Sequence, residues 1–104
     1  MAEYISEQVR QIDGNVYDCL SGTLTNGTTD YRMAWQSVTK GYSAEFVNNS
    51  ATADYTIKLN STSNDSITID AGTSKTIDDF EITAIYLSNA SGSSISYQVT
   101  VIGA

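Results

Sequence analysis

The chain contains no histidine and no proline, and it has a single cysteine, Cys19. Without histidine, a serine or cysteine nucleophile activated by an imidazole is excluded, and so is a His-ligated zinc site. One cysteine cannot form an intrachain disulfide, which favours synthesis in a reducing cytoplasm. A lone cysteine is most often a small buried apolar residue, and we expect this of Cys19.

Basic residues and long apolar runs are also scarce. Lys and Arg total 5 against 12 Asp and Glu, which gives a formal charge of −7 over 104 residues. A phosphate backbone would be repelled and no basic cluster offsets this, so we expect no nucleic-acid partner. No segment approaches the roughly 20 apolar residues of a membrane span, and the first residues have no signal-peptide pattern, so we expect no membrane contact.

The densest carboxylates lie in the second half of the chain: Asp65, Asp70, Asp78, Asp79 and Glu81. Their spacing matches no calcium loop, and adjacent side chains such as those of Asp78 and Asp79 point in opposite directions on an extended backbone. A glycosidase would need two carboxylates in a cleft, which a short chain of small strands rarely supplies. We therefore interpret them as solvated turn residues and expect no metal, cofactor or catalytic residue, hence no enzyme.

Residues 53–60, 66–70 and 94–101 alternate apolar and polar side chains, so that each segment can bury one face of a strand. Further strands are expected at 31–38, at 43–47 with Ala44 and Phe46 inward, and at 81–88, where apolar residues on both faces suggest a central strand. Regular turns between them predict one all-β domain over residues 31–104, an antiparallel β-sandwich of the jelly-roll kind. The predicted core comprises Tyr55, Ile57, Leu59, Ile67, Ile69, Ile82, Ile85, Leu87, Tyr97, Val99 and Val101.

Residues 1–30 differ from the rest and are expected to form an extended or partly helical N-terminal arm. Ile5, Val9 and Ile12 have helical spacing, Gly14 interrupts the pattern, and residues 16–20 are a possible first strand. Asn26-Gly27 suits a tight turn with positive φ. Leaving the arm's large apolar side chains in water costs roughly 1.5–3 kcal/mol each, so we expect them to meet another subunit. The candidate interface residues are Tyr4, Ile5, Val9, Ile12, Tyr17 and Leu20.

Two further patterns concern the surface. The Asn-x-Ser/Thr triplets are interpreted as chance products of a chain rich in these residues; they begin at Asn26, Asn48, Asn60, Asn64 and Asn89. Of the aromatic residues, Trp35, Tyr55 and Tyr97 share apolar faces with aliphatic residues and are expected in the core. A second group of four tyrosines is freer to stack on a sugar or to contact a protein partner. It consists of Tyr4, Tyr17, Tyr31 and Tyr42.

The segment from Phe46 to the last residue resembles small bacteriophage virion proteins of the siphovirus and podovirus type. The resemblance rests on the strand at 54–60, on the strand and Ala-Gly turn at 66–74, on residues 77–92, and on the closing Val101-Ile102-Gly103. It implies a β-sandwich structural component of the particle, namely a head decoration or cement protein, a head fibre, or a small tail part. It implies no active-site residue.

From this resemblance and the arm, we expect a capsid decoration or cement protein in the virion, which stabilises the head through protein–protein contacts. Its partners would be the major capsid protein or other virion proteins, and it would form a homo-oligomer, with a trimer favoured because it fits local three-fold positions. The alternative is a carbohydrate-binding or adhesin-like tail or fibre module, which exposed tyrosines and Asn-rich loops would serve.

Overall fold

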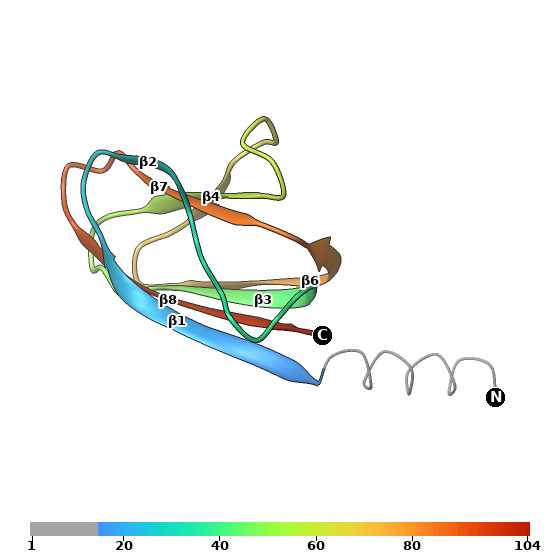
Figure 1. Ribbon diagram of the computed structural model, residues 1–104. Coiled ribbons are helices and arrows are strands. Elements are labelled where there is room, and N and C mark those ends of the chain that lie inside the picture. The colour runs from blue at the N-terminus through green and yellow to red at the C-terminus, as the bar shows by residue number, and fades with distance from the viewer. Residues whose placement is uncertain (1–14) are drawn as a thin grey trace.

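A computed structural model describes residues 15–104, which form two four-stranded antiparallel sheets lying face to face (Figure 1). The first sheet has the order β1-β8-β3-β6 and the second has the order β2-β7-β4-β5. The strands are β1 (Val16–Leu24), β2 (Thr28–Arg32), β3 (Gly41–Asn48), β4 (Tyr55–Leu59), β5 (Ile67–Ile69), β6 (Ser74–Ile82), β7 (Ile85–Asn89) and β8 (Ile95–Gly103). No helix among these residues is long and apolar enough to cross a membrane.

The core lies between the two sheets, where the alternating residues of each strand meet. β8 is the clearest case, because Ile95, Tyr97, Val99 and Val101 are buried while the residues between them face outward. Every residue predicted for the core is buried except Ile67, which packs against the core but is only partly covered. Ile67 begins β5, a three-residue strand at the edge of the second sheet, where a neighbour is missing on one side.

β1 and β2 belong to the two sheets, although the sequence predicts an arm over residues 1–30; the possible first strand at 16–20 is confirmed as part of β1. β1 pairs with β8 over its whole length, from Val16 opposite Gly103 to Leu24 opposite Ile95. The paired strands therefore begin at Val16 rather than at residue 31. Leu20 packs partly against the core, and Tyr17 is 67% exposed. The remaining candidate interface residues lie outside the described residues; they are Tyr4, Ile5, Val9 and Ile12.

The strand predicted at 31–38 is shorter and begins earlier, because β2 ends at Arg32. The chain then runs irregularly to Gly41, and Met33 and Val38 are buried while Trp35 packs partly on the core. The strand expected over 31–38 is therefore confirmed only at its first two residues, and the buried Met33 and Val38 lie in the irregular segment after it.

The central strand predicted at 81–88 is wrong: the chain reverses there, with β6 ending at Ile82 and β7 beginning at Ile85. The side chain of Asn60 holds this reversal. Its Nδ2 donates to the Glu81 carbonyl (2.9 Å), and its Oδ1 accepts from the Thr83 amide (2.8 Å). The apolar residues that seemed to occupy two faces of one strand are instead the inward residues of two strands in different sheets.

The turn at Asn26-Gly27 forms as predicted, with Gly27 at φ 89°. It does not close a hairpin, because β1 belongs to the first sheet and β2 to the second. The Gly27 amide donates to the Asn89 carbonyl (2.8 Å), so the turn is a corner that carries the chain from one sheet to the other.

Candidate functional site

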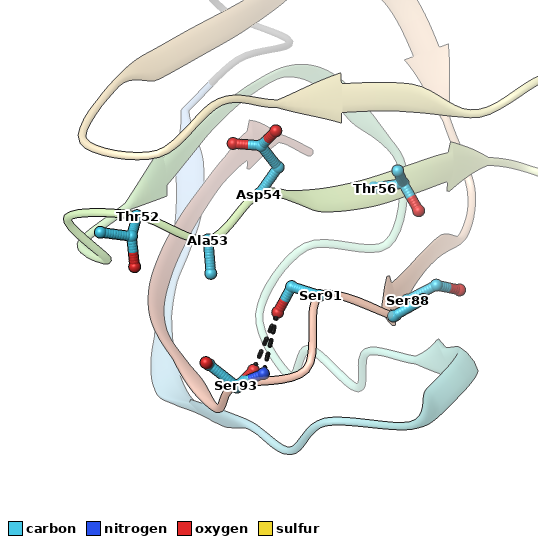
Figure 2. A pocket seen from close by; sticks show the side chains of 8 residues that line it. Thr52, Ala53, Asp54, Thr56, Ser88, Ser91 and Ser93 are labelled. Atoms are coloured by element: carbon cyan, nitrogen blue, oxygen red, sulfur yellow. Dashed lines mark hydrogen bonds between the residues drawn. The ribbon is translucent and has the colours of Figure 1, made fainter.

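A polar hollow with a volume of about 450 Å³ opens beside β4 and β7 of the second sheet (Figure 2). Its wall is formed by hydroxyl side chains, one carboxylate and two alanines. The lining residues are Thr52, Ala53, Asp54, Thr56, Ser88, Ala90, Ser91 and Ser93. The hollow is therefore built from the β3–β4 connection, the β7–β8 connection and the outer faces of β4 and β7.

Strand alternation places two of the hydroxyls. Thr56 and Ser88 are cross-strand partners of β4 and β7, and both lie on the face away from the core because their neighbours Ile57 and Leu87 are fully buried. Side chains opposite each other in an antiparallel pair lie roughly 4.5–5.5 Å apart at Cβ. The two hydroxyls are thus held close together on a rigid pair of strands.

The β7–β8 turn forms a second wall, which is fixed by the buried side chain of Asn89. Ser91 Oγ donates to Asn89 Oδ1 (2.7 Å) and accepts from the Ser93 amide (3.2 Å). Asn89 Nδ2 in turn donates to the carbonyls of Leu24 (2.8 Å) and Ser93 (2.7 Å). Figure 2 shows Ser91 directed towards Ser93 across this turn. The wall is therefore tied to the end of β1 and has little freedom to move.

Asp54 supplies the carboxylate of the hollow. Its Oδ1 accepts from the Ala71 amide (2.8 Å), which joins the start of β4 to the loop after β5. Oδ2 accepts no hydrogen bond from any residue between 15 and 104, so one oxygen of an exposed carboxylate is available to a ligand.

An ion pair borders the hollow on the side of β2. Lys58 Nζ lies 3.4 Å from Asp30 Oδ1, with the two side chains only 26% and 27% exposed. Ser88 connects to the same group, because its Oγ accepts from the Asp30 amide (2.8 Å) and donates to Asp30 Oδ1 (3.3 Å). Asp30 has the left-handed φ of 50°, which a short polar residue tolerates better than most. The pair links β4 to β2 across β7.

The next row of the same outer face brings an aromatic ring between two cations. Tyr86 of β7 is opposite Lys58 of β4 on one side and Arg32 of β2 on the other. Tyr86 is half-buried and Arg32 is exposed. This row follows directly on the Thr56–Ser88 row, so it adjoins the hollow on the same outer face without lining it.

The chemistry available here is hydrogen bonding and charge pairing. The whole chain lacks histidine. No group of three or more His, Cys, Asp or Glu residues within the described part of the chain could hold a metal ion. Hydroxyls that both donate and accept, together with a carboxylate that accepts, match the groups of a hydroxyl-rich ligand.

The outer face of the first sheet carries an apolar pair instead. Tyr17 and Ile102 are cross-strand partners of β1 and β8, 67% and 41% exposed. Cys19 lies two residues further along β1 and is also exposed, with Gln98 Nε2 at 3.5 Å and Thr100 Oγ1 at 3.6 Å from its Sγ. The expectation of a buried cysteine is wrong. Cys19 lies on the same outward side of β1 as Tyr17, whereas Leu20 lies on the side that packs against the core.

The tyrosines and carboxylates considered in the sequence analysis differ in how exposed they are. Tyr55 and Tyr97 are buried, Tyr31 is 48% exposed and Tyr42 is half-buried. Sequence reasoning did not find the hollow, since its serines and threonines come from segments far apart in a chain that is rich in both. The sequence does contain one signal for the hollow: Thr56 and Ser88 alternate with apolar residues, which places both on the outer face of their strands. The carboxylates considered for a metal are all exposed; these are Asp65, Asp70, Asp78, Asp79 and Glu81.

No known protein-family model matches the sequence, and no curated protein is similar to it. Solved structures do share the fold. A de novo designed double-stranded β-helix is 13% identical over 81% of this chain and 97% of that chain, with a TM-score of 0.53. The cupin domain of an XRE family transcriptional regulator from Enterobacter cloacae is 10% identical over 82% and 79%, with a TM-score of 0.57.

A third similar structure comes from work on Bacillus endospore appendages, described as disulfide-linked pili. It is 15% identical over 85% of this chain and 86% of that chain, with a TM-score of 0.52. At such identities the likeness concerns the fold alone. The chain thus has an all-β fold of two antiparallel sheets, like those of cupin and other double-stranded β-helix proteins.

Proposed function

We propose that this protein is a non-enzymatic structural subunit that acts through protein–protein contacts, specifically a bacteriophage head decoration or cement protein. The observation that carries the proposal is the exposed pair Tyr17 and Ile102, side by side on the outer face of the first sheet. Burying a large apolar side chain contributes about 1.5–3 kcal/mol, so a partner surface over this pair would be favourable.

The position of the pair supports a role in assembly. β1 begins at Val16, so Tyr17 is the second residue of the strand and is close in sequence to residues 1–14. Those residues include Tyr4, Ile5, Val9 and Ile12, which the sequence assigns to subunit contacts. Contacts made only in the assembled state shift the equilibrium towards assembly by mass action, and a trimer suits local three-fold positions of a shell. The endospore appendage protein is an example of this fold in a polymer.

The self-association part is tested by sedimentation of the full chain and of a Tyr17→Ser, Ile102→Thr double variant. We expect the full chain to form a discrete oligomer and the double variant to dissociate at the same concentration. Phe80→Ser is the matched control, because Phe80 is 45% exposed on β6, at the other edge of this sheet. A double variant that associates like the parent would contradict the proposal.

The virion part is tested on phage heads that lack the protein. The purified chain should bind to them and raise their thermal stability, and the double variant should do neither. If the unaltered chain leaves the heads unbound and equally labile, the decoration role is wrong, whatever its oligomeric state.

The polar hollow favours a second candidate function, that of a carbohydrate-binding module of a tail or fibre. The Thr56 hydroxyl and the open oxygen of Asp54 offer the bonds that sugar hydroxyl groups make. Glycan-array binding by the isolated chain tests this candidate. Loss of that binding in Thr56→Val would place it at the hollow, whereas unchanged binding would place it elsewhere.

A further inference from the structure

We propose that the hollow and the adjoining Lys58–Tyr86–Arg32 row form one site for a sugar that carries a carboxylate. This inference rests on the second candidate function and adds to it the chemical class of the ligand. The site lies on the outer face of the second sheet and runs across β4, β7 and β2.

The hollow suits the neutral part of such a ligand. Thr56 Oγ1 has no hydrogen-bond partner among the described residues, and Asp54 Oδ2 is equally open, so both are available to hydroxyl groups. The Ser91–Ser93 turn is already bonded to Asn89, which keeps this wall in place without a ligand. Groups fixed in advance lose little conformational freedom on binding.

The next row suits a ring and its charge. Tyr86 is half-buried, so part of its side chain remains accessible on this face. Arg32 and Lys58 flank it at roughly 4.8 Å of strand spacing on either side. A sugar ring seated against Tyr86 therefore lies within reach of both cations.

The two cations are not equivalent, and this decides where the carboxylate binds. Lys58 is already paired with Asp30 at 3.4 Å, whereas Arg32 is exposed and has no acidic partner among the described residues. A guanidinium binds a carboxylate through two parallel N–H···O bonds. Arg32 is thus the carboxylate-binding residue, and the ligand's hydroxyl groups point towards Asp54.

The negative charge around the site limits which acidic sugars can bind. Asp54 and Asp30 border the hollow, and the whole chain carries a net charge of −7. A ligand that is charged along its whole length would be repelled, so the site suits a single carboxylate at one end of an otherwise neutral sugar. Binding should therefore weaken as salt screens the Arg32 contact.

The test is titration of the full chain, followed by amide chemical shifts, with a disaccharide of glucuronic acid and glucose and with the matched disaccharide of two glucose units. We expect the acidic sugar to bind with a millimolar Kd, to shift the amides of Thr56 and Ser88, and to bind more tightly than the neutral one. Arg32→Gln should weaken acidic-sugar binding roughly tenfold and leave neutral-sugar binding unchanged. Lys40→Gln is the matched control, because it removes the same charge from a residue outside the site and should change neither.

The possible outcomes separate the inference from the function on which it rests. Equal binding of both sugars at the hollow would overturn the carboxylate assignment and leave the carbohydrate-binding candidate standing. An equal loss in Arg32→Gln and Lys40→Gln would also overturn the assignment, because it would show a general charge effect. No shift with either sugar at high millimolar concentration would overturn both the inference and the candidate function.

Discussion

Asn48 and Asn89 occupy matching positions at the ends of β3 and β7, and their buried amides make equivalent hydrogen bonds. Asn48 Nδ2 donates to the carbonyls of Ala53 (2.8 Å) and Ile69 (3.0 Å), and Asn89 Nδ2 donates to those of Leu24 (2.8 Å) and Ser93 (2.7 Å). In each case one carbonyl belongs to the loop that follows, and the other ends a strand of the opposite sheet. The Asn-x-Ser triplets at 48–50 and 89–91 were interpreted as chance products of the composition. Their asparagine side chains in fact connect the two sheets, and we call each such set of hydrogen bonds a clamp.

Asn48→Asp should destabilise the domain, because a carboxylate cannot donate to the two buried carbonyls and brings a charge into the core. An unsatisfied buried polar group costs about 1–3 kcal/mol. Chemical denaturation measures the loss. Asn49→Asp makes the same chemical change at the exposed neighbouring position and should have little effect. Equal midpoints for the two variants would show that the Asn48 clamp contributes little.

Gly103→Ala should be strongly destabilising, because Gly103 lies opposite Gly41 where the backbones come unusually close. An added Cβ would overlap the Lys40 carbonyl and would lie 2.8 Å from Gly41 Cα. Overpacking of this kind costs about 1–3 kcal/mol or more. Gly22→Ala is the control in β1, since its Cβ would meet only the end of the Tyr97 side chain, with the hydroxyl oxygen at 3.2 Å, and the two thermal midpoints should differ clearly.

Acid should destabilise the parent through Asp18. The Val38 amide (2.9 Å), together with that of Ser37, bonds its carboxylate and lowers its pKa below the usual 3.8. A lowered folded-state pKa means that this stabilisation is present above pH 3.8 and is lost as pH falls through the folded-state value. Asp18→Asn should lose less stability than the parent over that range in urea denaturation.

The acid experiment has a matched control in Asp70→Asn. Asp70 is exposed, and its carboxylate makes no hydrogen bond with a described residue. Its substitution should leave the parent's loss of stability in acid unchanged. If both variants behave like the parent, the contacts between β1 and residues 37–38 do not depend on the charge of Asp18.

High pH should destabilise the fold by ionising the buried phenols of Tyr55 and Tyr97. Burial raises the pKa of both phenols, and the Tyr55 hydroxyl donates to the Val47 carbonyl (3.0 Å). The raised folded-state values mean that this stability is present below pH 10, the ordinary pKa, and is lost as pH rises beyond it. Tyrosinate absorbance should therefore show these two phenols ionising above pH 10, with a loss of stability in the same range. Tyr55→Phe should lose less stability than the parent over that range, because it lacks the phenol whose pKa burial raises.

The Cys19 thiol should react with an aromatic disulfide reagent in the folded protein, because its side chain is exposed on the face that carries Tyr17 and Ile102. A bulky maleimide on Cys19 should lower self-association in sedimentation if that face is the contact surface. A chain labelled to completion that still associates normally would place the contact elsewhere, and unlabelled Cys19→Ser serves as the control.

The strands that bury alternate residues were predictable from sequence, because period-two alternation is a local property. Ala44, Phe46, Ile57 and Val99 were assigned to the core side on this basis alone, and all are fully buried. The reversal after Ile82 was not predictable in this way. It depends on Asn60, a residue 23 positions before the Thr83 amide to which its side chain binds.

The hollow escaped prediction for the same physical reason. Thr56 and Ser88 become neighbours only through the pairing of β4 with β7, and the carboxylate of Asp54 is fixed by an amide from the loop after β5. The prediction for Cys19 is wrong because it relies on the usual burial of cysteine and not on the alternation of side chains along the strand. A cysteine that alternates with Asp18 and Leu20 faces the side of Tyr17, and this could have been recognised from the strand pattern alone.

The strand order of the first sheet has a consequence for how the chain is made. β8 is the last strand along the chain, yet it lies between β1 and β3 and pairs with both. Until β8 leaves the ribosome, β1 has no partner in its sheet, and β3 can pair only with β6. Closure of the sandwich therefore waits until β8 has been synthesised, and contacts this distant in sequence form slowly. A nascent chain halted before residue 95 would expose the inward faces of the first sheet, and these are the faces that a chaperone would hold.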